Sequence, residues 1–213
     1  MEAKTLAVSV AHGIASLPMD FYLGIERTFQ DLNLADGGKN IQRRNFGEDE
    51  RMYRALNKLF RNRAILGQIA EMIIKDSLSY LPDPALKKIT DKLIGAASSL
   101  GSRQSMQLAI TGYLGSKVVG GMMASVITKL SLRLWTGTLA GGIVLQGVLS
   151  RASAASRRLR HQNPELWSRL YILDFEMLYF LFEEPLANYI ELGETLRKNP
   201  SKTEQFLGAI ENL

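Results

Sequence analysis

The sequence predicts an all-α protein, folded as a single globular bundle of about nine or ten helices around a central apolar hairpin. Runs of alternating apolar and polar residues, which would indicate strands, are missing. Apolar residues instead recur at three- and four-residue spacing, and residues that start and stop helices punctuate the chain. A length of 213 residues suits one domain, 1–213, with a sizeable core.

The chain is expected to begin with two short helices. A modest helix over 2–16 stops before Pro18, and apolar spacing over 20–34 predicts a second helix that ends at Asp36. The polar and basic residues 37–47 predict a loop.

A long helix is predicted next, over residues 48–81. Acidic residues stand at its start, where the helix dipole favours negative charge, and an apolar stripe follows them. Gly67 is a predicted kink in this helix. Asp83 and Pro84 then form an N-cap and first-turn pair, which predicts a helix over 84–99.

Residues 103–128 and 131–150 are predicted to form two helices that are apolar or small on nearly every side. The short link 128–133 is expected to turn one helix into the other. Residues 151–161 continue as a basic tail or helix extension.

The last part of the chain predicts three more helices. Asn163 and Pro164 form a start signal for a helix rich in aromatic residues that reaches Phe182. A further helix is expected over 185–198, and Ser201 begins a capping box that opens the last one.

The middle of the chain contains no acidic residue. The 73 residues from Lys92 to Pro164 carry nine Lys or Arg and no Asp or Glu, within a net charge of +5. Residues 1–91 have a net charge of +1, and residues 165–213 have one of −5. Because carboxylates are costly in hydrocarbon and common on soluble helices, this exclusion indicates a segment that is able to enter a bilayer.

The predicted hairpin, residues 104–150, has the dimensions that insertion requires. Residues 104–128 offer 25 positions interrupted only by Lys117, and residues 134–150 offer 17 uncharged positions. A spanning helix needs about 20 residues, so the second segment is short, but Arg133 and Arg151 at its two ends are able to snorkel. Its Gly, Ser, Thr and Gln content keeps the hairpin marginally apolar, which suits a protein that is soluble first and membrane-bound later.

Small residues in the hairpin repeat at helical spacing. Gly137 and Gly141 form a GxxxG pattern, and Gly112, Ser116 and Gly120 recur every four residues, a spacing that allows close helix approach. The same glycines are also compatible with packing inside a soluble bundle. We expect eight of them to act in helix packing and insertion: Gly112, Gly115, Gly120, Gly121, Gly137, Gly141, Gly142 and Gly147.

Three cations within the hairpin and one that flanks it are expected to set insertion depth and to mark its tip and flanks: Lys117, Lys129, Arg133 and Arg151. The acidic C-terminal residues are candidates to dock on this basic block, and anionic lipid or low pH would then compete with the docking. Solvated helix faces are the alternative for Glu165, Asp174, Glu176, Glu183, Glu184, Glu191 and Glu194.

Other function classes find little support. Cations spread singly through apolar sequence do not indicate nucleic-acid binding. No motif of a hydrolase, a nucleotide-binding loop or a metal site is present, and His12 and His161 stand far apart, so no enzyme activity, metal or cofactor is expected. The chain has no Cys, and its N-terminus lacks the pattern of a Sec signal peptide.

A helical domain of about 200 residues with an apolar hairpin late in the chain resembles the pore-forming domain of bacterial colicins. It is also similar to the small membrane-depolarising effectors of type VI secretion. A chain that begins at Met1 without further domains fits the effector better, although here helices follow the hairpin. The resemblance implies a target in the bacterial inner membrane and a cognate immunity protein in the producer. The marginal apolarity of the hairpin predicts a form that is soluble in the producer, and its small-residue faces predict homo-oligomers in a bilayer.

Three functional hypotheses follow. The first is a pore-forming antibacterial toxin that inserts into a bilayer, preferably an anionic one. The second is a soluble helical protein-binding module, such as an immunity protein, adaptor or chaperone-like bundle, whose glycines serve core packing. The third is a membrane protein with a constitutive hairpin.

Overall fold

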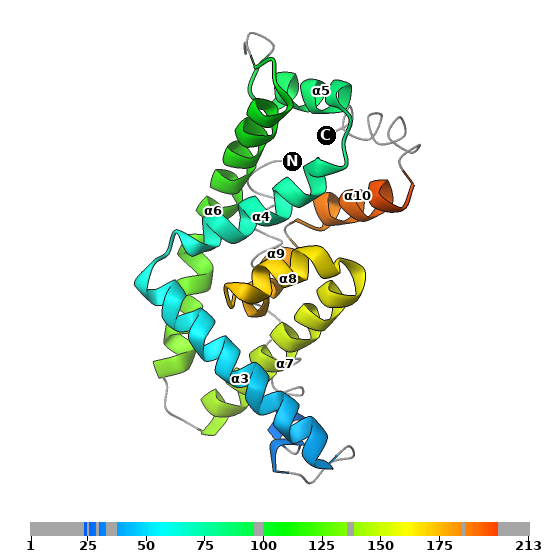
Figure 1. The fold of residues 1–213 in the computed structure, drawn as a ribbon. Coiled ribbons are helices and arrows are strands. Elements are labelled where there is room, and N and C mark those ends of the chain that lie inside the picture. The colour runs from blue at the N-terminus through cyan, green and yellow to red at the C-terminus, as the bar shows by residue number, and fades with distance from the viewer. Residues whose placement is uncertain are drawn as a thin grey trace.

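The computed structural model describes residues 24, 26–28, 30–32, 38–95, 100–135, 139–184 and 186–199, without the side chains of 118, 121–144, 188 and 192. The described part is all-α, as predicted, and contains no strand. Its helices, labelled as in Figure 1, are α3 (Gly38–Arg61), α4 (Ile65–Ser79), α5 (Asp83–Leu93), α6 (Arg103–Trp135), α7 (Leu139–Gln162), α8 (Pro164–Ile172), the short 3-10 helix η1 (Glu176–Leu178), α9 (Phe180–Glu183) and α10 (Ala187–Lys198).

The helices surround a central wedge made by α8, η1 and α9 (Figure 1). This wedge contacts α4 on one side and α7 on the other, while α3 contacts η1 and α7 from outside. Above the wedge, α4 lies between α6 and α10, and α5 packs on the first part of α6. The hairpin α6–α7 therefore spans both halves of the bundle.

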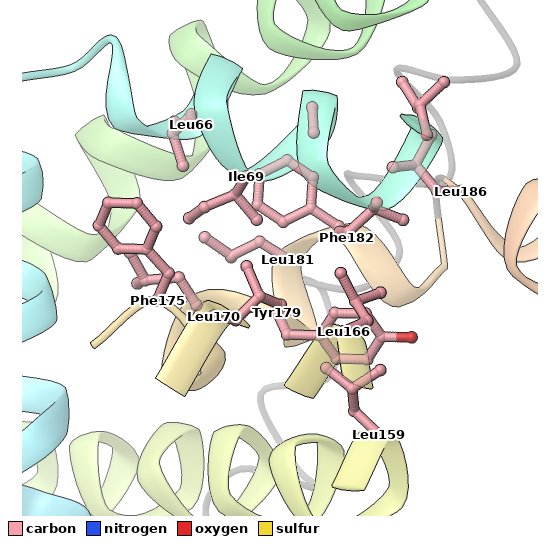
Figure 2. Packing of buried hydrophobic residues seen from close by; sticks show 14 of the residues in the cluster. Leu66, Ile69, Leu159, Leu166, Leu170, Phe175, Tyr179, Leu181, Phe182 and Leu186 are labelled. Atoms are coloured by element: carbon pink, nitrogen blue, oxygen red, sulfur yellow. The ribbon is translucent and has the colours of Figure 1, made fainter. Parts of the chain in front are cut away.

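Buried apolar side chains fill the space between the wedge, α4 and α7. Phe182, which is fully buried, lies beside Ile69 of α4, and Leu159 of α7 lies below Leu166 and Tyr179 (Figure 2). Each large apolar side chain buried in this way stabilises the fold by about 1.5–3 kcal/mol. The wedge therefore supplies a large part of the described core.

Helix α3 begins ten residues earlier than predicted. The segment 37–47 was expected to be a loop, but residues 38–47 are helical. Asn45 explains the difference, because it is buried and its Nδ2 donates to Asp31 Oδ1 at 2.9 Å. A tertiary hydrogen bond therefore fixes a polar stretch whose sequence carries no apolar stripe.

The long helix predicted over 48–81 is two helices. The chain leaves α3 at Arg61 and re-enters a helix at Ile65, where Asn62 Oδ1 accepts a hydrogen bond from the Ala64 N–H at 3.0 Å. Local side-chain bonds of this kind compete with helix continuation. Gly67, the predicted kink, lies inside α4.

The turn of the hairpin was predicted wrongly. Residues 128–133 continue α6, which ends at Trp135, so Lys129 and Arg133 lie within this helix rather than in the turn. No Gly or Pro interrupts residues 128–135, and the next glycine is Gly137. The predicted helix extension over 151–161 is confirmed, because α7 continues to Gln162.

The end of the chain agrees with the prediction in the start of α8 and in the position of α10. Asn163 caps α8 as expected, and its side chain accepts from the Leu166 N–H at 3.0 Å. The aromatic helix is broken at Asp174, which adopts a positive φ of 59°. Helix α10 lies close to the predicted 185–198, whereas the predicted helices over 2–16 and from Ser201 fall outside the described residues.

Candidate functional site

Helices α6 and α7 form a hairpin whose 60 residues, 103–162, contain no carboxylate. The two helices contact each other, and their outer ends contact different neighbours, α4 and α5 for α6, and α8, η1 and α9 for α7. The candidate site is therefore held at its base by the rest of the bundle (Figure 1).

The inner face of α6 belongs to the core. Met106 and Ile110 are 5% and 0% exposed, and they lie in the core cluster shared with α4 and α5. Gly115 is also buried, and a Cβ at this position would lie 3.6 Å from Glu71 Cγ. This predicted glycine therefore packs at ordinary van der Waals distance, with little spare space.

The outer face of α6 carries the repeat of small residues. Gln104, Leu108, Gly112, Ser116 and Gly120 recur every four residues, and all five are exposed. A Cβ built at Gly112 or Gly120 meets no heavy atom within 4 Å among the described residues. No described residue packs closely against these two glycines.

The second half of α7 packs tightly through small side chains. Ala152 and Ala155 are fully buried, and the predicted Gly147 is buried as well. Small residues let α8, η1 and α9 approach the α7 backbone closely. The glycines of the hairpin thus divide into two groups: Gly115 and Gly147 serve the core, while Gly112 and Gly120 face outward.

Ion pairs connect the base of the hairpin, which is the start of α6 and the end of α7, to the rest of the bundle. Arg158 makes a two-pronged pair with Glu183 of α9, at 2.8 Å and 2.6 Å, and hydrogen bonding to Glu183 raises the pKa of Arg158 above its ordinary value. Arg157 Nη1 lies 2.5 Å from Glu48 of α3. At the start of α6, Arg103 Nη1 lies 2.6 Å from Asp83 Oδ1.

Arg27, which is 2% exposed, adds a buried connection. Its guanidinium donates to Asp49 Oδ1 at 2.5 Å, to the Asn45 carbonyl oxygen at 3.2 Å and to Ser153 Oγ of α7 at 3.2 Å. Burial raises the pKa of Asp49 above its ordinary value, although the charge of Arg27 lowers it. Sequence reasoning missed Arg27, because nothing local distinguishes it from an exposed arginine.

The acidic C-terminal residues dock differently from the expectation. Glu183 does bind the basic block, but Asp174 and Glu176 bind α3: Arg51 Nε lies 2.5 Å from Glu176 Oε1, and Lys58 Nζ lies 2.8 Å from Asp174 Oδ2. Burial opposes ionisation of Asp174, yet Lys58, Arg54 and Arg51 outweigh it and lower the pKa of this carboxyl. Glu165, Glu184 and Glu191 are exposed.

The predicted cations occupy different surroundings. Lys117 is exposed, with Nζ 5.6 Å from the centre of the Tyr113 ring, whereas Arg151 is partly buried with its guanidinium carbon 5.8 Å from the centre of the Phe180 ring. Gly121, Gly141 and Gly142 lie in helical backbone whose side-chain environment is not described, and Gly137 falls outside the described residues.

Within the described part of the chain, no helix combines the length and the apolarity that crossing a membrane requires. The same residues contain no group of three His, Cys, Asp or Glu able to hold a metal ion. Comparison with family models, with curated proteins and with solved structures finds no match.

Proposed function

We propose that this protein is a pore-forming antibacterial toxin, which inserts the α6–α7 hairpin into the inner membrane of a target cell. The proposal includes a water-soluble form in the producing cell and a cognate immunity protein, both of which rest on the resemblance to colicins and type VI effectors. Neither catalysis nor a cofactor is part of this function.

The outer face of α6 carries the proposal. Glycine in the interior of an exposed helix costs about 0.5–1 kcal/mol relative to alanine, so glycines that contact nothing weaken the bundle. Gly112 and Gly120 are in this position. In a bilayer, the same small residues allow helices to pack backbone to backbone, as a GxxxG face does. Membrane association would therefore explain two glycines against which no described residue packs.

Weak ion pairs at its base would allow the hairpin to be released. The pairs Arg158–Glu183 and Arg157–Glu48 involve arginines that are 52% and 45% exposed, so each pair stabilises the closed form by about 1 kcal/mol or less. Anionic head groups offer both arginines alternative partners. The hairpin itself brings no carboxylate that lipid would repel.

The polar side chains of the hairpin suggest how it would be arranged in lipid. Gln104, Gln107 and Lys117 lie on α6, and Lys117 alone would cost about 2.5–3.5 kcal/mol at the centre of a lipid-facing helix. Several hairpins that turn these groups toward a shared aqueous lumen would avoid this cost. Homo-oligomers in the membrane are therefore part of the proposal.

A second candidate function is a protein-binding module. Leu108 is 73% exposed and lies one turn from Gly112, so the outer face of α6 also has the chemistry to bind an apolar helix of a partner protein. On this alternative, the same face would bind protein and leave vesicles intact.

Dye release from vesicles of phosphatidylcholine mixed with phosphatidylglycerol tests the proposal. The wild-type chain is expected to release the dye, and Gly112→Leu/Gly120→Leu is expected to lose release while it keeps helicity and unfolding stability, since its leucines enter open space. Gly101→Leu, which also meets open space but precedes α6, is the control and should keep release. Vesicles that stay intact at high wild-type dose would exclude pore formation and leave the binding module.

A further inference from the structure

Helix α3 exposes a row of aromatic side chains. Phe46, Tyr53 and Phe60 are 56%, 71% and 45% exposed. They stand seven residues apart, which is two helical turns, so they lie along one face about 21 Å in length. Monomeric surfaces tolerate single exposed apolar residues, but an ordered row indicates contact with something else.

The fold does not require this aromatic row. A different face of α3 supplies the core with Met52, Ala55, Leu56 and Leu59, all buried. The helix lies along the outside of the bundle, with α7 behind it (Figure 1). Thus α3 has one apolar face turned inward and a second one turned outward.

Cations surround the aromatic row, and most nearby acids are directed elsewhere. Glu48 pairs with Arg157 and Arg27, and Asp49 pairs with Arg27, so both are engaged by cations of the bundle. Glu50 is the one exposed acid of α3, and it pairs with Arg54 at 2.5 Å. Against it, the exposed cations of α3 and of the turn that follows are Lys39, Arg43, Arg44, Lys58, Arg61 and Arg63, of which Arg44 pairs with Glu48 and Lys58 with Asp174.

We infer that the outer face of α3, defined by Phe46, Tyr53 and Phe60 and the exposed cations around them, docks on an anionic bilayer before the hairpin inserts. Aromatic rings beside Lys and Arg are the chemistry of a helix that lies in a membrane interface. The face carries a net positive charge that complements anionic head groups. This inference rests on the proposed function and identifies the surface through which that function would begin.

An ion pair and a buried arginine connect α3 to the hairpin. Glu48 of α3 holds Arg157 of α7, and Arg27 joins Asp49 of α3 to Ser153 of α7. Glu48 lies about 200° around the helix from Phe46, so the Glu48–Arg157 pair is on the side of α3 that faces α7, away from the aromatic row.

Co-sedimentation with vesicles of phosphatidylcholine, alone and mixed with phosphatidylglycerol, measures docking apart from dye release. We expect Arg43→Gln/Arg61→Gln to weaken binding to the anionic vesicles roughly 25-fold, from about fivefold per charge. Phe46→Ser/Tyr53→Ser should weaken it by about tenfold or more. The matched controls are Lys75→Gln/Lys87→Gln and Ile94→Ser/Ile172→Ser, exposed residues outside α3, and should change it less than about twofold.

The outcomes separate this inference from the proposed function. If the chain binds anionic vesicles through α3 but releases no dye, docking stands and pore formation fails. If wild type releases dye and both α3 variants bind as wild type does, the α3 face is excluded and pore formation stands. Absence of binding to anionic vesicles, or equal binding to both kinds, overturns the inference. The inference is also overturned if the wild-type chain is a dimer, and if Phe46→Ser/Tyr53→Ser dissociates this dimer without changing vesicle binding. That result would show that the face binds a second copy of the chain.

Discussion

The inner and outer faces of α6 belong to one helix but differ in what they contribute. Ile110 on the inner face is fully buried, while Leu108, two residues earlier, is 73% exposed. Gly115 is buried beside Glu71, while Gly112 and Gly120 contact nothing within 4 Å among the described residues. The comparison teaches that one face of this helix packs in the described core, whereas the other face is exposed and could contact lipid.

The largest expected effect comes from shortening an inner-face side chain. Ile110→Ala should reduce the free energy of unfolding by about 2–5 kcal/mol, because it leaves a cavity between α6 and its neighbours. Leu108→Ala, in the same helix, should change it by no more than about 0.5 kcal/mol. Urea unfolding of both variants measures the difference, and equal losses would mean that the two faces are not distinct.

Two glycines extend the comparison from the faces of α6 to packed and exposed helix positions in general. A Cβ at Gly193 of α10 would lie 2.9 Å from the Ser77 Cα of α4, so Gly193→Ala should cost about 1–3 kcal/mol by forcing α10 away from α4. Gly112→Ala should instead stabilise the chain by about 0.5–1 kcal/mol, since it raises helix propensity in open space. Thermal unfolding of the pair should therefore shift in opposite directions, and a shift in the same direction would contradict the account.

A substitution at Asp174 tests how much its ion pairs with α3 stabilise the fold. Its folded-state pKa is lowered, so its contribution to stability is complete above the unfolded-state value of about 4 and is lost as the pH falls through the folded-state value. Asp174→Asn should therefore cost about 1–2 kcal/mol at neutral pH, and this difference should shrink as the pH drops below about 4. Urea midpoints measured across that range would contradict the assignment if the difference were constant.

The smallest effect on stability is expected at the hairpin base. Glu183→Gln breaks the pair with Arg158 while it keeps every cation, and should reduce stability by less than about 1 kcal/mol. If this pair helps to retain the hairpin, dye release from anionic vesicles should become up to about fivefold faster. Glu184→Gln, the exposed neighbour, is the control, and identical release by both variants would show that the pair retains nothing.

The sequence predicts this fold where local chemistry decides the structure. Asn163 and Pro164 start α8 because the capping side chain and the fixed proline dihedral act within one turn. It fails where distant residues decide. The break at Asp174 is stabilised by Arg51, Arg54 and Lys58 of α3, and the first turns of α3 are held by Asn45, contacts that no local pattern reveals.

The composition of the candidate site could be predicted from the sequence, but the face of α6 that is exposed could not. The absence of carboxylates and the spacing of the small residues can be read directly from the chain. Because α6 is small or apolar on nearly every side, its periodicity does not show which face packs. The exposure of Gly112 and the burial of Gly115 follow from the position of α4, which only the tertiary structure gives.

The most direct test of the central claim follows the outer face of α6 from water into lipid. The chain has no cysteine, so Ser116→Cys, at an exposed position of that face, accepts a single environment-sensitive dye, and Lys87→Cys on α5 provides the control. With anionic vesicles whose acyl chains carry a quencher, the dye at 116 should shift to the blue and be quenched, while the dye at 87 should not. A dye at 116 that stays in water while the vesicles are saturated with protein would contradict insertion of the hairpin.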